Sequence, residues 1–128
     1  MVGEGERATV VLVGEVPARR LPTLRGLLEG AGFEVATCPG TAERACPALS
    51  GGSCPVGVPA AAAIVLRPSG GASELPEVCG WALGAPVLVI EEGSDAGPEV
   101  GHRIARIGQG RGPLAAVQAL RTLLAASS

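Results

Sequence analysis

The sequence lacks several residue types on which common protein functions depend. It contains no lysine, asparagine or tyrosine, and it has a single Phe, Trp, Asp (Asp95) and His (His102). Aromatic side chains that could stack on bases are scarce, and the ten basic residues, all arginine, are spread along the chain. We therefore expect no nucleic acid binding by this chain alone. With one imidazole available as a base, we also do not expect a nucleophilic enzyme.

Long apolar runs are missing as well. No segment approaches the roughly 20 apolar residues that a membrane-spanning helix needs. The N-terminal MVGEGERA carries charges before the first apolar run, unlike a secretory signal. We therefore expect a cytoplasmic protein without a membrane segment, in which thiols stay reduced by default.

What the sequence does contain is enough apolar material for one core. The chain has 128 residues, of which 47% are hydrophobic, and a formal net charge of -2. This length predicts a single domain over residues 1–128. Because aromatic residues are nearly absent, the core must be built from Val, Leu, Ile and Ala.

Short apolar runs alternate with helix-like segments along the chain. Runs typical of buried parallel strands lie at 8–16, 33–38, 61–68, 85–92 and 103–108. Helical patterns lie at 21–32, with Gly30 and Gly32 as C-cap candidates, at 74–83, and at 113–126. In the last of these we expect one buried stripe, formed by Leu114, Val117, Leu120 and Leu124. The alternation predicts an α/β fold: a flavodoxin-like three-layer sandwich around a five-stranded parallel sheet.

One part of this pattern resembles a known family. The stretch VLVGEVPARRLPTLRGLLEGAGFEV is similar to the first strand, first helix and second strand of response-regulator receiver domains, and AAAIVLRPSGG, APVLVIEE and the last helix continue the likeness. The resemblance implies a receiver-like domain with a role in signal transduction. In receivers an Asp ending the third strand accepts a phosphoryl group, acidic residues after the first strand hold a divalent cation, and a Lys ends the fifth strand.

These functional residues are largely missing from the present chain. The positions that match the receiver site are held by Gly14 and Glu15, by Leu66 or Arg67, by Glu91 and by Gln109. Neither the phosphoacceptor nor the lysine is present, and a sequence without Lys offers no alternative alignment. The resemblance therefore implies a pseudo-receiver: a phosphorylation-independent regulatory or protein-interaction module, with a protein partner or a second copy of itself as its partner.

The carboxyl edge of the predicted sheet is where doubly wound folds bind ligands. We expect Arg67 at this edge to pair with Glu15 or Glu91. The glycine-rich turn GQGRGP follows the fifth predicted strand, and free backbone N–H groups around Gly108, Gly110 and Arg111 can hold an anion there. A second alternative function is thus the binding of a small anionic ligand by residues of this edge: Glu15, Arg67, Glu91, Gly108, Gly110 and Arg111.

Three Cys-Pro dipeptides lie in the segment TCPGTAERACPALSGGSCP, with Cys38, Cys46 and Cys54 eight residues apart. Their prolines and the neighbouring glycines make a long helix implausible, so we expect an irregular loop over 38–60 in place of the second receiver helix. The cysteines, together with Cys79, are open to three interpretations: reduced buried thiols, a disulfide, or a zinc or iron-sulfur site. The last would make the chain a thiol-based metal or redox sensor, although no C-x₂-C pair supports it. The pseudo-receiver interpretation requires no cofactor.

Overall fold

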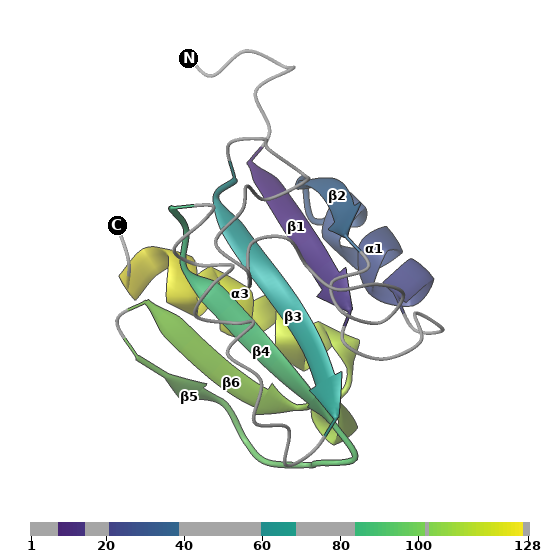
Figure 1. The fold of residues 1–128 in the computed structure, drawn as a ribbon, viewed down its shortest axis with the longest axis vertical. Helices are drawn as coiled ribbons and strands as arrows, with labels where there is room; N and C mark the ends of the chain where they lie inside the picture. Colours follow the sequence, from purple (N-terminus) through teal and green to yellow (C-terminus); the bar gives the residue numbers. More distant parts are fainter. Residues whose placement is uncertain (1–7, 15–20, 39–59, 69–83, 102, 127–128) are drawn as a thin grey trace, which may run out of the picture.

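The computed structural model describes residues 8–14, 21–38, 60–68, 84–101 and 103–126 (Figure 1). Within these residues six strands form one sheet: β1 (Thr9–Gly14), β2 (Glu34–Cys38), β3 (Ala62–Pro68), β4 (Val87–Glu92), β5 (Glu99–Val100) and β6 (Ile104–Gly108). The helices are α1 (Leu21–Gly30) and α3 (Pro113–Ala126), and a 3₁₀ turn, η2 (Gln109–Arg111), precedes α3.

The strand order is β2-β1-β3-β4-β6-β5. The first five of these strands are parallel to their neighbours and have the flavodoxin-like order, which confirms the predicted sheet. The sequence did not predict β5, a two-residue strand that pairs antiparallel with β6 at the edge of the sheet. Such a short strand has no apolar pattern of its own, so its pairing with β6 depends on the tertiary fold.

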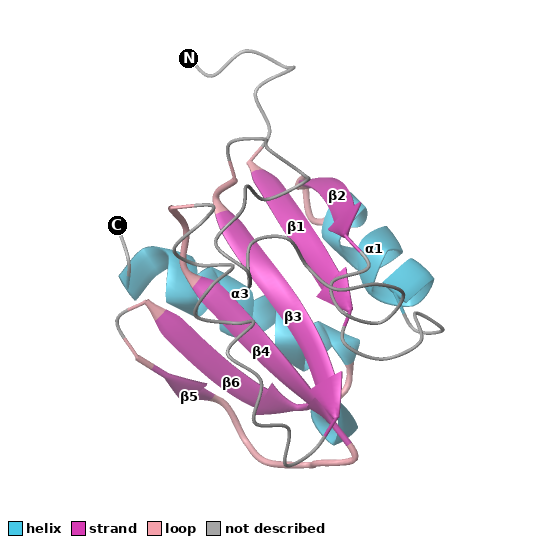
Figure 2. Cartoon of the chain, viewed as in Figure 1, coloured by secondary structure: helices cyan, strands magenta, loops and turns pink. Residues whose placement is uncertain are grey.

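Both faces of the central strands are buried, which matches their continuous apolar sequences. Side chains alternate between the two faces of a strand, so Val10 and Leu12 of β1 join one core cluster while Val11 and Val13 join another. The first cluster packs against α1 and α3, which both lie on the same side of the sheet (Figure 2). All four of these β1 side chains have little or no exposed surface. This is the burial that continuous Val/Leu runs of parallel strands predict.

Helix α1 buries an apolar face of about one turn and ends in a glycine C-cap. Leu24 and Leu28, at i and i+4, are buried in the first cluster. After the helix, the Phe33 N–H donates to the Leu28 carbonyl (3.0 Å) and the Gly32 N–H donates to the Glu29 carbonyl (3.1 Å), which is the Schellman arrangement. Gly32 has a φ of 96°, so it is the predicted C-cap glycine, whereas Gly30 is the last helical residue.

Helix α3 has the predicted bounds, but its buried face differs from the predicted stripe. Val117 and Leu120 are buried as expected, whereas Leu124 is only half-buried and Leu114 is 67% exposed. The buried face consists of Ala116, Val117, Ala119, Leu120 and Leu123. The expectation for Leu114 was wrong because small alanines complete the buried face, and a search for large apolar residues at helical spacing overlooks them.

Several predicted features lie outside the described residues: the helix at 74–83, residues 39–59 of the Cys-Pro loop, Glu15 and His102. The single-domain boundary at 1–128 therefore stays a prediction. No helix within the described part of the chain is long and apolar enough to cross a membrane.

Candidate functional site

Four parallel strands end side by side at the carboxyl edge of the sheet. In the strand register, Gly14 of β1 lies beside Leu66 of β3, Arg67 of β3 beside Glu91 of β4, and Glu91 beside Gly108 of β6. Of the residues predicted for this edge, the register brings Arg67, Glu91 and Gly108 together, while Gly110 and Arg111 follow in η2 and Glu15 lies outside the described residues. This edge is the candidate functional site.

Arg67 and Glu91 form one of the two ion pairs that the sequence left open for Arg67; the other, with Glu15, lies outside the described residues. The Arg67 Nη2 atom lies 3.6 Å from Glu91 Oε2, and the two side chains are 7% and 22% exposed. The Arg67 Nε is buried and has no hydrogen-bond partner among the described residues. Alternation along β3 places Arg67 on the same face as Ala63 and Val65, away from α1 and α3. The pair therefore neutralises the buried guanidinium, but it leaves part of its hydrogen-bonding capacity unused.

The glycine-rich turn after β6 is fastened to the loop after β4. The Gly108 N–H donates to the Ala96 carbonyl (2.9 Å), and the Gly110 N–H donates to the Ser94 carbonyl (2.8 Å). Neither donor is free, so these two N–H groups do not form the anion site that the sequence suggested. Their role within the protein is to hold the end of β6 against the β4–β5 loop.

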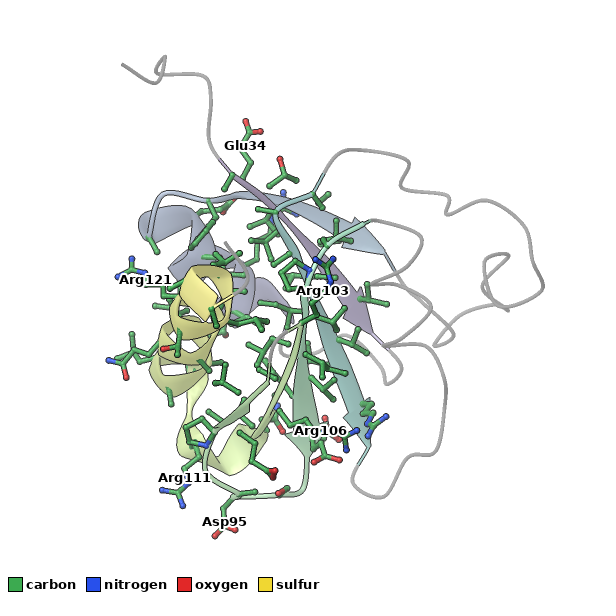
Figure 3. The ribbon with its side chains drawn as sticks, turned by 90° about the vertical axis from the view of Figure 1, so that its left-hand side faces the viewer. Glu34, Asp95, Arg103, Arg106, Arg111 and Arg121 are labelled. Carbon is green, nitrogen blue, oxygen red and sulfur yellow. The ribbon has the colours of Figure 1, made fainter. Side chains whose placement is uncertain are left out.

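Arg111 takes part in the same fastening. Its Nε donates to the Asp95 carbonyl oxygen at 2.6 Å, and both residues are exposed. Figure 3 shows Arg111 and Asp95 at the outer end of the molecule, whereas Arg103 and Arg106 lie on the side of the sheet away from α3. Asp95, the sole aspartate of the sequence, is therefore in the loop beyond β4 and not at the end of β3.

Gly108 allows the close approach between turn and loop. A Cβ atom at this position would lie 2.5 Å from both the Ala96 nitrogen and the Ser94 oxygen, which are backbone atoms. Any side chain would therefore push the two segments apart. The glycine is required here by this contact, since its φ is an ordinary negative value.

A pocket of about 270 Å³ opens on the other face of the sheet, at the same edge. It lies between the first turns of α1 and α3, over the ends of β3, β4 and β6. Its lining is mainly apolar: Leu24, Leu66, Ile90, Pro113 and Ala116, with Thr23, Gln109, Gly108 and Gly112. Leu66, one of the two residues that the resemblance offers for the phosphoacceptor position, thus borders the same space as Gln109, which the resemblance matches to the lysine position.

The sequence did not predict this pocket. Its lining comes from α1, β3, β4, β6, η2 and α3, and four of its nine described residues are ordinary core residues: Leu24, Leu66, Ile90 and Ala116. The one available signal was the resemblance, which matched Leu66 or Arg67, and Gln109, to two positions of a common site. The chain has an alkyl or guanidinium side chain and an amide at these positions, where the resemblance implies an Asp and a Lys.

The structure describes only one of the four cysteines. Cys38 ends β2, beside Val13 in the register, while Cys46, Cys54 and Cys79 lie outside the described residues. Within the described ranges no group of three or more His, Cys, Asp or Glu side chains could hold a metal ion. The thiol-based interpretations stay predictions.

Comparison with known proteins supports the fold. No protein-family model matches the sequence, and no curated protein matches it. Among solved structures, the chain is similar to the crystal structure of a response regulator receiver protein from Sinorhizobium medicae WSM419. The TM-score is 0.64 at 15% sequence identity, and the alignment covers 94% of this chain and 98% of that chain. The protein therefore has a receiver-like, flavodoxin-like fold, as the sequence resemblance implied.

Proposed function

We propose that the protein is a pseudo-receiver, a regulatory or protein-interaction domain that keeps the receiver fold and works without phosphorylation. Fold similarity does not carry this proposal, since one fold hosts many functions. The observation that carries it is the chemistry at the end of β3. Leu66 faces an apolar pocket, and on the opposite face Arg67 pairs with Glu91.

Phosphoryl transfer to a protein side chain needs a nucleophile at phosphorus and cations that offset the charge of the transition state. Strand β3 contains no carboxylate, and the matching position after β6 holds the uncharged Gln109. The nearest carboxylate on the neighbouring strand is Glu91, which faces the guanidinium of Arg67. These residues support a domain that does not accept a phosphoryl group from a donor.

A domain without this chemistry can still regulate through contacts. Its partner is then another protein or a second copy of itself, and regulation depends on whether that partner is bound. The anionic-ligand alternative is not favoured, because the Gly108 and Gly110 N–H groups already donate within the protein.

Intact-mass spectrometry tests the proposal. The protein is incubated with acetyl phosphate and Mg²⁺, with an active receiver domain treated in parallel as the positive control. We expect the control to gain one phosphoryl group and this protein to keep its mass. A hydroxylamine-labile gain of one phosphoryl group in this protein would contradict the proposal.

A further inference from the structure

The pocket between the first turns of α1 and α3 has the form of a ligand site. Its volume of about 270 Å³ far exceeds the roughly 10–15 Å³ that one enclosed water molecule needs. It lies outside the carboxyl ends of the strands, which is where open α/β sheets bind ligands. A mainly apolar lining with a few convergent polar groups is typical of small-molecule sites. Its size and place thus suit one small molecule.

Two glycines that line the pocket have backbone requirements that exclude a side chain. Gly108 cannot carry a side chain because of its contact with the β4–β5 loop. Gly112 has a φ of 89°, a conformation that residues with a Cβ rarely adopt. Neither position can therefore supply an apolar side chain to close the space, and Ala116 contributes only a methyl group to the wall.

The lining selects against charged ligands. Its apolar floor is formed by Leu24, Leu66 and Ile90, and no charged side chain is among the lining residues that the structure describes. An unpaired charge placed against this floor would lose part of its hydration without gaining a partner among these residues, so a charged ligand should bind more weakly than its uncharged counterpart.

The polar groups at the rim select for a hydrogen-bonding ligand. Two lining residues have side chains that can hydrogen-bond: Thr23, in the first turn of α1, has a hydroxyl group, and Gln109, the first residue of η2, has an amide. Both side chains can donate and accept. We infer that the pocket binds a small, uncharged, mainly apolar molecule that carries one hydrogen-bonding group, such as an aromatic or short-chain alcohol.

Binding of this kind goes beyond the function proposed above and does not depend on it. The mass measurement detects covalent phosphorylation, whereas ligand binding is detected by the NMR shifts of amides that line the pocket. Either result can fail without the other, so the two claims are tested separately.

The test is a titration of the ¹⁵N-labelled protein with benzyl alcohol, followed by amide NMR shifts, with benzoate as the charged counterpart. We expect saturable, millimolar binding of benzyl alcohol that shifts the amides of Leu24, Leu66, Gln109 and Ala116. Benzoate should bind about tenfold more weakly or not at all. Shifts spread over the whole surface, or equal binding of benzoate, would overturn the inference.

Two variants locate the site. Ala116→Leu adds three carbon atoms to the pocket wall and should abolish benzyl alcohol binding, while Ala125→Leu, on an exposed position of the same helix, should leave binding unchanged. If Ala116→Leu does not fold, Gln109→Ala tests the inference instead, because Gln109 is only half-buried and its substitution is better tolerated by the fold. It should weaken benzyl alcohol binding about threefold or more and leave toluene binding unchanged, because a hydrocarbon makes no hydrogen bond. Unchanged benzyl alcohol binding in Ala116→Leu, or in Gln109→Ala, would overturn the inference.

Discussion

Arg67 is a buried charged residue near the carboxyl edge of the sheet, and the one ion pair that it forms among the described residues is with Glu91, at 3.6 Å. The guanidinium has five N–H donors, and its buried Nε has no acceptor within the described part of the chain. A buried ion pair of this kind is stabilising only in comparison with a single unpaired charge. The pair therefore adds little to stability, and its main effect is to fix the register of β3 and β4 at their carboxyl ends.

Two substitutions separate these effects. Glu91→Gln removes the counter-charge and should lower the free energy of unfolding by about 1–3 kcal/mol, because the Arg67 charge is then buried without a partner. Arg67→Met removes the charge while keeping an apolar side chain of similar length, and should leave stability unchanged or raise it. Urea denaturation measures both. A neutral Glu91→Gln together with a strongly destabilising Arg67→Met would contradict the assignment.

The exposed pair on α1 is the matched control. Arg25 Nε lies 3.4 Å from Glu29 Oε2, one helical turn away, and both side chains are about half exposed. Exposed pairs of this spacing contribute roughly 0.3–0.5 kcal/mol. Glu29→Gln should therefore change stability far less than Glu91→Gln does.

Gly108 and Gly26 provide a second comparison of single residues. Gly108→Ala should destabilise the fold by about 1–3 kcal/mol, because its Cβ would overlap backbone atoms of the β4–β5 loop. A Cβ atom added at Gly26, in the middle of α1, would meet nothing within 4 Å among the described residues beyond its own turn of helix. Gly26→Ala should therefore stabilise the protein by about 0.5–1 kcal/mol. Thermal unfolding of the two variants should give shifts of opposite sign. Equal shifts would mean that the turn and the loop are not in close contact.

At the scale of elements, α3 lies on the sheet through a face rich in alanine. Leu120 is fully buried in that face, whereas Leu114, in the first turn, is 67% exposed. Leu120→Ala should cost about 2–5 kcal/mol, and Leu114→Ala should change stability by less than about 0.5 kcal/mol. Chemical denaturation distinguishes this face from the stripe that begins at Leu114. Similar losses for the two variants would favour that stripe.

The elements that the sequence predicted well are those with strong local patterns. The Val/Leu runs of β1 and β4 can be buried on both faces only as central parallel strands, and Gly32 ends α1 as its position suggests. Strand β5 could not be predicted, because two exposed residues carry no periodicity. The hydrogen bonds of the turn after β6 could not be predicted either, because their carbonyl acceptors, in Ser94 and Ala96, are more than ten residues away in the sequence.

At the scale of the whole molecule, the sequence predicted the location of the site better than its character. The Arg67–Glu91 pair followed from two strand ends that lie side by side in a parallel sheet. In the glycine-rich turn, the Gly108 and Gly110 N–H groups that were expected to be free instead donate to carbonyls of the β4–β5 loop. The pocket depends on which face of β3 each residue occupies, and a shift of one residue decides whether Leu66 or Arg67 borders it.

The central claim is that a receiver-like fold has an apolar pocket and a buried ion pair where a receiver has its reaction centre. Its most direct test is the amide NMR spectrum during addition of beryllofluoride, a phosphoryl mimic, together with Mg²⁺. We predict no saturable shift at Leu66, Glu91 or Gln109, because the end of β3 offers no carboxylate to hold the mimic. Saturable shifts centred on these three amides would contradict the claim.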